Sequence, residues 1–380
     1  MELSEATRRA KAWACYDCGK CTAVCPIVRA GGIYSPRKHV LSCNTGDPNE
    51  VFELDSLFAC LSCSLCEYRC PAEVTYTELV LHMREMAYDE GIEPDCPHGG
   101  TLQSLMRLMS KGGTQQNRLE WIEDGLDSEP EKGEVFFWTG CAVYYDNLFP
   151  DYGFSSINGL KAAVKVFNAL DVKPVVSGEE RCCGHDLLWN GDRKSFEALA
   201  RHNVKLVQES GAEMLVTSCA ECLRTWKLDY EKFFDGPAPK MLHMTEYLTD
   251  RMSELDLKEN RELNVTFQDP CRLGRHLDIY DSPREVMEAL PGVELTEMKR
   301  SKAASACCAG GTWSNCDMFA KKIQVDRLKE AKSTGAEVMI TACPKCQIHF
   351  SCAMKDPNLK GEIEIEMRDV TELVADAISK

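Results

Sequence analysis

Two cysteine runs of the same spacing lie near the start of this chain, and they constrain its fold more than any other feature. In each run, two residues separate successive members of a cysteine triplet, and a fourth cysteine follows after three more residues, directly before a proline. The runs are Cys15, Cys18, Cys21 and Cys25 before Pro26, and Cys60, Cys63, Cys66 and Cys70 before Pro71. Three thiolates at this spacing can bind three corners of a cubic iron–sulfur cluster from one tight loop.

This is the spacing of bacterial proteins that hold two [4Fe–4S] clusters, in which the fourth cysteine of each run binds the other cluster. It assigns Cys15, Cys18, Cys21 and Cys70 to one cubane cluster, and Cys60, Cys63, Cys66 and Cys25 to the other. Structural zinc is the competing interpretation. It is disfavoured because zinc sites use two separated Cys-x-x-Cys pairs and need neither a third thiol nor a fourth before proline.

Composition and charge narrow the classes of protein further. The chain has 22 cysteines, and its first 13 residues contain no apolar core of a secretory signal, so we expect a cytoplasmic protein whose thiols bind metal. A net charge of −16 argues against a nucleic-acid partner and suits docking onto other proteins. No run of 18 apolar residues occurs, so we expect no direct membrane span, and any membrane association would come through a partner subunit.

Hydrophobic periodicity gives a coarse map of the elements. The second run leads into a helix that begins with a capping box of Thr75 and Glu78 and ends at Gly91. Further helices are predicted near 102–123, 160–170 and 195–209, and strands at 134–138, 172–177 and 214–217. The predicted domains are a helical ferredoxin-like domain at 1–100, a helical connector at 101–133, and α/β half-domains at 134–260 and 261–380.

The two α/β half-domains are predicted to be copies of each other. The segment SGAEMLVTSC at 210–219 and the segment TGAEVMITAC at 334–343 are identical at five of ten positions. Alternating strands and helices indicate small, mostly parallel sheets, one in each half. We therefore expect the halves to be related by a pseudo-twofold axis.

Each half carries five cysteines in the same order: one alone, an adjacent pair, and a Cys-x-x-Cys pair. The first set is Cys141, Cys182, Cys183, Cys219 and Cys222, and the second set is Cys271, Cys307, Cys308, Cys343 and Cys346. The cysteines fall at or just after the carboxyl ends of predicted strands, where open α/β sheets place their sites. Adjacent cysteines rarely form a disulfide with each other, but a turn can direct both sulfurs at one cluster. Five thiolates exceed the four that a cube needs, which indicates an unusual cluster or a bridging thiolate.

These sets resemble the CCG-domain family, specifically the catalytic subunit of heterodisulfide reductase. The first 100 residues resemble its small ferredoxin-like partner subunit, including the segment YSPRK at 34–38. The resemblance covers nearly the whole chain and implies that each five-cysteine set binds one noncubane [4Fe–4S] cluster, with the two clusters facing a substrate disulfide. One departure is Ala309, which follows the second pair where the family usually has glycine.

The leading functional hypothesis is a disulfide-reducing subunit of an iron–sulfur oxidoreductase. Electrons from a flavoprotein or cytochrome b-type partner would pass through two cubane clusters to two noncubane clusters, which would cleave a small-molecule disulfide. In a methanogen this disulfide would be the coenzyme M–coenzyme B heterodisulfide. The alternative is a non-catalytic electron relay in a flavin-based bifurcating, benzoyl-CoA reductase-type or hydroxy-acid oxidase complex.

Residues beside the ligands are the candidates for catalysis. His185 and His276 could pass a proton to a departing thiolate, although a histidine at such a position is more often a hydrogen-bond partner. Lys345, Arg272 and Arg275 could bind an anionic substrate or tune the potential of a cluster. The simpler alternative for each of them is an ion pair at the protein surface. Four cysteines lie outside both systems: Cys43, Cys96, Cys316 and Cys352. Most of these four are expected to act as small, buried apolar residues.

Overall fold

The N-terminal part of the protein is helical. The computed structural model describes residues 3–46, 57–113, 115–258, 262–314, 316–359 and 361–379. The first helices are α1 (Leu3–Arg9), α2 (Lys20–Val24), α3 (Pro26–Ala30), α4 (Pro36–Thr45), α6 (Leu65–Tyr68) and α7 (Tyr76–Asp89). They pack around a core to which several cysteines of the two runs contribute, and this core also includes residues of the C-terminal part such as Ala309 and Ile323. Short helices fit this part of the chain because both cysteine runs force tight turns.

Helix α7 follows the second run as predicted, but its cap differs from the prediction. Thr75 makes no side-chain cap, because the Glu78 carboxylate instead accepts from His82 Nε2 at 2.9 Å. At the other end Gly91 adopts a left-handed backbone with φ 79°, and the amide of Ile92 donates to the carbonyl of Ala87 at 2.8 Å. A glycine stop of this kind satisfies the last carbonyls of a helix, so the predicted end is confirmed.

The connector is less helical than its sequence suggests. Its helix α8 (Thr101–Met109) ends well before residue 123. The amide of Ser110 still bonds to the helix, and Gly113 then takes a left-handed conformation that turns the chain. The predicted helix over 102–123 is therefore wrong beyond Met109, because two glycines at 112 and 113 interrupt it.

The first α/β half is built on a parallel sheet of order β1-β2-β3. Its strands are β1 (Val135–Trp138), β2 (Met214–Thr217) and β3 (Lys240–His243). Its helices are α9 (Ala142–Leu148), α10 (Ser156–Ala169), α11 (His185–Trp189), α12 (Arg193–Ser210), α13 (Ala220–Leu228) and α14 (Met244–Thr249). The strand predicted at 172–177 is reduced to Val175, which forms isolated parallel bridges to Phe136 and to Glu129, so that prediction is wrong in extent.

The second half repeats this topology with a sheet of order β5-β4-β6-β7. Its strands are β4 (Leu263–Gln268), β5 (Val293–Leu295), β6 (Val338–Thr341) and β7 (Glu366–Asp369). Its helices are α15 (Gly274–Leu277), α16 (Ser282–Glu288), α17 (Met318–Lys332), α18 (Pro344–Met354) and α19 (Val370–Ala377). In each half the outer position beside the first strand is filled, by the Val175 bridge in one and by β5 in the other. The predicted combination of a helical ferredoxin-like domain with two α/β halves is confirmed. The pseudo-twofold axis between the halves stays a prediction. The predicted boundary at 260/261 touches residues outside the described ranges.

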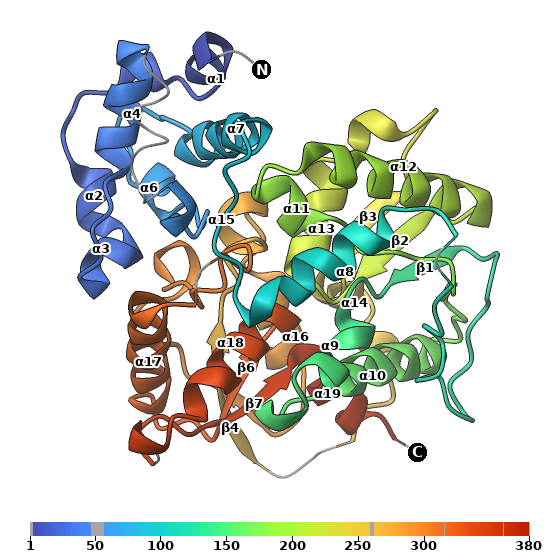
Figure 1. Ribbon diagram of the computed structural model, residues 1–380. Coiled ribbons are helices and arrows are strands. Elements are labelled where there is room, and N and C mark those ends of the chain that lie inside the picture. Colours follow the sequence, from blue (N-terminus) through green and yellow to red (C-terminus); the bar gives the residue numbers. More distant parts are fainter. Residues whose placement is uncertain are drawn as a thin grey trace.

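The two halves pack against each other through one continuous hydrophobic core. Helix α10 of the first half lies against α19 of the second, and Leu257 pairs with Ile378 in an antiparallel bridge. The N-terminal domain lies at one end of this body, where α7 contacts α11 and α3 contacts α17, so it touches both halves (Figure 1). Within the described residues, no helix combines the length and the apolar character needed to cross a bilayer.

Candidate iron–sulfur sites

The cysteines of the first run lie around a cavity in the N-terminal domain. This cavity is lined by Cys15, Cys18, Cys21 and Cys70, with Cys66 at its edge. The fourth cysteine of the second run thus lies among the first three of the first run. Cys18 is exposed, so this predicted cluster position lies at the protein surface.

The second predicted position lies deeper and also contains a residue from the other run. Burial raises the pKa of the Cys25 thiol to about 12, and Cys63 and Cys60 add to the shift as charged neighbours. The pKa of Cys66 is also raised, first by burial and then by charges that include Cys60. The placement of Cys25 beside the second run and Cys70 beside the first matches the crossed assignment, which we retain as a proposal.

Backbone amides point at several of these sulfurs. They donate from Asp17 to Cys15 at 3.4 Å, from Ser62 to Cys60 at 3.3 Å, from Val74 to Cys70 at 3.4 Å and from Gly184 to Cys182 at 3.3 Å. Amide donation to cysteine sulfur is one of the means by which proteins set the potential of an iron–sulfur cluster. The donor chemistry of the thiols therefore fits the predicted cofactors.

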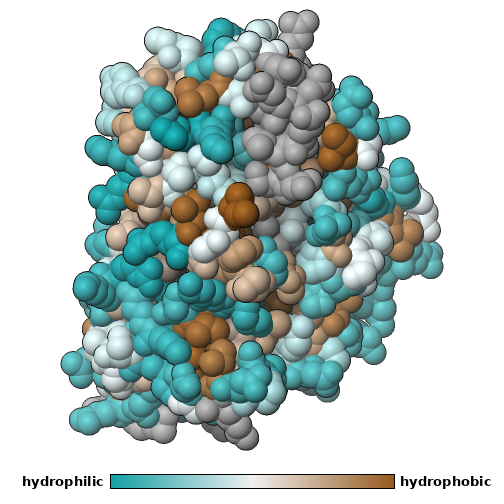
Figure 2. Space-filling model, turned by 60° about the vertical axis from the view of Figure 1, so that its left-hand side comes forward, coloured by the Kyte–Doolittle hydropathy of each residue, from teal (hydrophilic) through white to brown (hydrophobic). Residues whose placement is uncertain are grey.

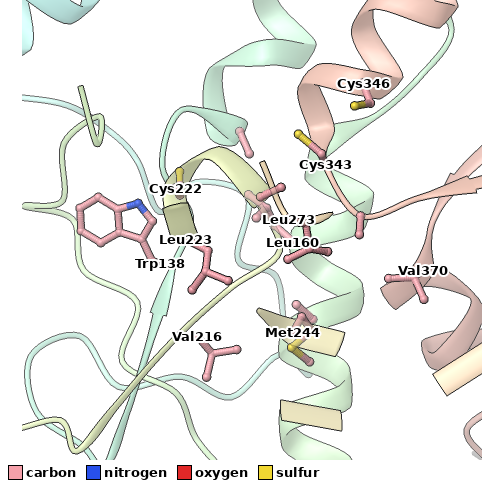
Figure 3. Packing of buried hydrophobic residues seen from close by; sticks show 14 of the residues in the cluster. Trp138, Leu160, Val216, Cys222, Leu223, Met244, Leu273, Cys343, Cys346 and Val370 are labelled. Carbon is pink, nitrogen blue, oxygen red and sulfur yellow. The ribbon is translucent and has the colours of Figure 1, made fainter. Parts of the chain in front are cut away.

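The two five-cysteine sets form one continuous line of neighbouring thiols. The contacts run Cys141–Cys182–Cys183–Cys222–Cys219–Cys343–Cys346–Cys308–Cys307–Cys271. Cys222 Sγ lies 3.5 Å from Cys183 Sγ. Figure 3 shows Cys222 and Cys343 on facing elements of the core, with Cys346 one turn further along its helix. The helices α13 and α18 position these residues, because each begins directly after the first cysteine of its Cys-x-x-Cys pair.

The two sets meet at Cys219 and Cys343. The pKa of Cys219 is lowered to about 6, because Cys222 and then Cys343 donate hydrogen bonds to its sulfur. A second junction joins the N-terminal domain to the second set: the pKa of Cys63 is lowered to about 6, first by a hydrogen bond from Cys307. The thiols of the second run and of both sets are thus connected through direct contacts.

The turn after each adjacent pair explains the departure at Ala309. Gly184 follows the first pair with φ 72°, a left-handed conformation that glycine adopts without strain. Ala309 occupies the equivalent position with φ 56°, so alanine takes the same conformation at a cost of about 1–2 kcal/mol. Ala309 itself therefore makes the turn that Gly184 makes after the first pair.

Gly140 supports a testable prediction about the first set. A Cβ added at Gly140 would lie 2.9 Å from Cys222 Sγ, and its backbone is left-handed with φ 60°. We expect Gly140→Ala to lose iron from the first set and to destabilise the protein by more than the about 1–2 kcal/mol of backbone strain. The matched control is Gly211→Ala, which has φ 71° and no atom within 4 Å of the added Cβ. Iron content and denaturant titration measure the effect, and equal behaviour of the two variants would contradict the prediction.

Lys345 is buried between the two halves rather than lying in a surface ion pair. Its Nζ lies 2.5 Å from Asp186 Oδ1 and 2.7 Å from Glu221 Oε2. His185 Nδ1 lies 3.1 Å from the same Asp186 oxygen. The pKa of His185 is held far below its usual range, first by burial and then by Arg272, so the ring is neutral. His185, Asp186 and Glu221 have ligand atoms within 4.8 Å of one another, but the Lys345 ammonium already lies against both carboxyl groups.

His276 and the two arginines bind the N-terminal domain instead of an open substrate pocket. Arg272 donates to the Ser62 carbonyl at 3.0 Å, and Arg275 Nε donates to the Cys63 carbonyl at 2.6 Å. His276 Nε2 lies 2.9 Å from the Ser62 carbonyl, and burial keeps its pKa far below the usual range. The surface ion pairs expected for these arginines are therefore wrong. A catalytic role for His185, His276 and Lys345 remains a prediction.

A buried ion pair beside Cys141 was missed in the sequence. Arg118 Nη2 donates to Glu180 at 3.0 Å and to the Gly140 carbonyl at 2.7 Å, and both charged side chains are almost fully buried. The Glu180 carboxylate also accepts from the Thr139 amide at 3.2 Å. The pair fixes the loop that presents the lone cysteine of the first set. No local pattern identifies it, because its partners are 62 residues apart in the sequence.

The four remaining cysteines do not share one environment. Cys43 is buried, and its thiol contacts Met83 Sδ at 3.6 Å, as expected for a small apolar residue. Cys96 and Cys352 are half-buried, and Cys316 is exposed. The expectation that most of these four cysteines are buried is therefore wrong, since it holds only for Cys43.

Comparison with known proteins places this arrangement in a family. Residues 14–75 match a 4Fe-4S dicluster domain, and residues 135–227 and 265–351 match a cysteine-rich domain of the CCG type. The chain is 30% identical to a subunit of dihydromethanophenazine:CoB–CoM heterodisulfide reductase from Methanosarcina barkeri, over 96% of this chain and 93% of the relative. It is 25% identical to a subunit of fumarate reductase (CoM/CoB) from Methanothermobacter marburgensis, over 92% of this chain and 70% of the relative.

A solved structure gives independent support for the fold alone. The crystal structure of a hypothetical protein from Helicobacter pylori superposes with a TM-score of 0.54 at 9% identity, covering 88% of this chain and 65% of that one. The fold and the sites define an iron–sulfur oxidoreductase component that joins a dicluster domain to two cysteine-rich domains. The chain belongs to the heterodisulfide reductase family of CCG-domain proteins.

Proposed function

We propose that this chain is the disulfide-reducing subunit of a larger oxidoreductase, with two cubane clusters in the N-terminal runs and two noncubane clusters in the five-cysteine sets. The observation that carries the proposal is the contact between Cys219 and Cys343, which puts the two sets face to face. When bound, the clusters would supply the two electrons that splitting a disulfide requires. Two complete sets in contact are what a substrate held between two metal sites needs.

The residues of the chain support this role in three ways. The thiol line from Cys63 through Cys307 gives the ferredoxin-like domain a short route to the second set. Buried aromatic side chains such as Trp189 and Trp313 keep bulk water from the sets. Lys345 links the two halves between the sets, because its ammonium lies against both Asp186 and Glu221.

The proposal is tested by loading and by spectroscopy. Anaerobically purified protein should contain about 16 irons per chain, as four four-iron clusters require. Oxidised protein should then show an EPR signal that changes on addition of a thiol, with coenzyme M, coenzyme B and an unrelated thiol compared. A fully loaded protein whose EPR spectrum ignores every thiol and disulfide would overturn the proposal.

An electron-relay role is the second candidate, and the burial of the sets favours it. Seven of the ten cysteines are buried, and Cys141, Cys219 and Cys271 are only half-buried. The relative from fumarate reductase (CoM/CoB) indicates that the architecture is not confined to heterodisulfide reductases. Rapid reduction of the clusters by a protein donor, without turnover of any disulfide, would select the relay.

The electron donor would dock on the face around the first run. Residues 3–46 contain seven lysines and arginines and two acidic residues, a local charge of +5 in a chain of net charge −16. The net charge alone did not predict this basic region. Trp13 is 73% exposed and Tyr16 is 72% exposed beside the exposed Cys18. Figure 2 brings this side of the molecule forward and shows separate apolar patches among hydrophilic ones. An acidic face of a flavoprotein or cytochrome b-type partner would fit such a surface.

Charge reversal tests this docking face. We expect Lys20→Glu with Lys38→Glu to slow reduction by an acidic protein donor about tenfold at low ionic strength, because steering is electrostatic. The difference should shrink as salt is added. Lys205→Glu, an exposed lysine on α12, is the matched control and should leave the rate unchanged. Stopped-flow absorbance of the clusters measures the rate of reduction. An equal decrease of this rate in the Lys205→Glu control would contradict the proposed docking face.

A further inference from the structure

A cavity lies beside helix α18, on the outer side of the second five-cysteine set. It is lined by Cys316 and Cys352, which belong to neither cluster system, together with Tyr152, Lys321 and His349. Cys316 is exposed and Cys352 is half-buried. Two thiols that bind no predicted cluster therefore line one cavity, and Cys316 is also accessible from solvent.

The two thiols are coupled to each other and to polar neighbours. Lys321 Nζ donates to Cys352 Sγ at 3.4 Å. The Tyr152 phenol hydrogen-bonds with Cys352 and also has Cys316 as a charged neighbour. The pKa of Cys316 is raised, first by partial burial and then by Cys352, while Lys321 acts to lower it and Asp317 to raise it. An ammonium group at this position can stabilise a sulfur as a thiolate, the form that attacks a disulfide.

His349 forms part of the wall of the same cavity. Its side chain is 6% exposed, and its Nε2 has no hydrogen-bond partner among the described residues. Its ring packs on Trp313 at 4.8 Å, and its Cδ2–Nε2 edge fits against Gly310, where an added Cβ would lie 2.7 Å from Cδ2 and 3.0 Å from Nε2. The unpaired nitrogen therefore faces Gly310, and the groups that the cavity offers to a solute are the two thiols and their neighbours Lys321 and Tyr152.

The arrangement does not suit a metal ion. Among the described residues, the one group of three potential ligands within 4.8 Å of one another is His185, Asp186 and Glu221, which lies elsewhere. The cavity thiols and histidine do not converge in that way. The Lys321 ammonium beside Cys352 also disfavours a cation. The chemistry left for two neighbouring thiols is exchange with a disulfide.

We propose that Cys316 and Cys352 form a redox-active dithiol that exchanges with small-molecule disulfides entering this cavity. The exposed Cys316 attacks the disulfide, forms a mixed disulfide and releases one thiol, which takes up the proton that Cys316 loses. Cys352 then attacks Cys316 Sγ, closes a Cys316–Cys352 disulfide and releases the second thiol. The substrate disulfide is reduced to two thiols, and the dithiol is oxidised by the same two electrons. No cluster takes part, so the site is independent of the function proposed above.

The test uses the iron-loaded full chain, in which cluster binding protects the ligand thiols. The probe is 2-hydroxyethyl disulfide, which is small and uncharged. We expect release of about two equivalents of 2-mercaptoethanol per chain, and peptide mass mapping should find the Cys316–Cys352 disulfide. Partial burial raises the pKa of the Cys316 thiol, so the rate should increase with pH.

Single variants separate the two steps. Cys352→Ser should stop at a mixed disulfide on Cys316 with about one equivalent released, and Cys316→Ser should abolish closure. Lys321→Gln should slow closure more than the first step. Cys96→Ser, which changes a half-buried cysteine outside the cavity, should leave the stoichiometry unchanged. Wild-type protein that stops at a mixed disulfide, or in which Cys316 reacts no faster than Cys96, would overturn the proposal.

Discussion

Replacement of Lys345 by methionine is expected to destabilise the protein by about 3–5 kcal/mol, because it leaves two buried carboxyl groups without their cation. In the wild type, Lys345 Nζ lies within 2.7 Å of both Asp186 and Glu221, and its side chain is 2% exposed. Chemical denaturation of the iron-loaded protein measures the loss. Lys161→Met is the matched control: it breaks a largely exposed pair with Glu123 and should cost less than about 1 kcal/mol.

The pH dependence gives this prediction a second test. Burial acts to raise the pKa of Asp186, but Lys345 overrides it and holds that pKa below its usual range. The pair therefore contributes stability above the pKa that Asp186 has in the unfolded chain, and this contribution is lost as the pH falls. In the variant, protonation removes the negative charge from the buried carboxyl groups, so a lower pH reduces the cost of burying them. The difference in free energy of unfolding between wild type and Lys345→Met should therefore become smaller as the pH is lowered. A difference that becomes larger would contradict the ion-pair explanation.

The sequence was sufficient for those parts of the site that rest on spacing. The cysteine runs and the repeated five-cysteine sets are local patterns, and the structure brings together the thiols that these patterns grouped. The same holds for the strand at 214–217, because buried parallel strands appear as short apolar runs. Predictions of this kind depend on residues that are neighbours in sequence.

The parts that could not be predicted depend on pairs far apart in the chain. Lys345 meets Asp186 across 159 residues, and Arg118 meets Glu180 across 62. A lysine between two cysteines has the same local sequence pattern whether it faces solvent or lies buried. The expected surface ion pair of Lys345 was therefore wrong. The helix predicted to reach 123 failed for the opposite reason, because apolar periodicity continued past two glycines that end α8 at Met109.

Ala309 shows where a resemblance needs the structure. The resemblance leads one to expect glycine at this position, and the sequence has alanine. Ala309 adopts a left-handed backbone with φ 56°, which is strained for alanine but forms the same turn. Both adjacent cysteine pairs are therefore followed by the same backbone conformation. Strain at such a position is kept where the surrounding structure holds it in place, which is common beside functional sites.

Cys307 is the residue through which electrons from the N-terminal domain would reach both sets. Its thiol contacts Cys271 and Cys308 within its set and Cys63 of the second run. We expect Cys307→Ser to lose about four of the about 16 irons and, in addition, to slow reduction of the first set by a protein donor. Its counterpart in the first set, Cys182, contacts Cys141 and Cys183. Cys182→Ser should lose the same number of irons and leave reduction of the second set at the wild-type rate.

The contrast between the two variants tests the direction of electron flow, because both remove one thiol from a matched position. Iron analysis establishes that each variant has lost a single site, and freeze-quench EPR with a reduced ferredoxin as donor follows the sites that remain. If the first set of Cys307→Ser is reduced as quickly as the second set of Cys182→Ser, the contact between Cys63 and Cys307 is not the route. Electrons would then have to enter through the first half, where α7 contacts α11. If reduction of the remaining set is slow only in Cys307→Ser, electrons pass from the second run to the second set and then to the first set.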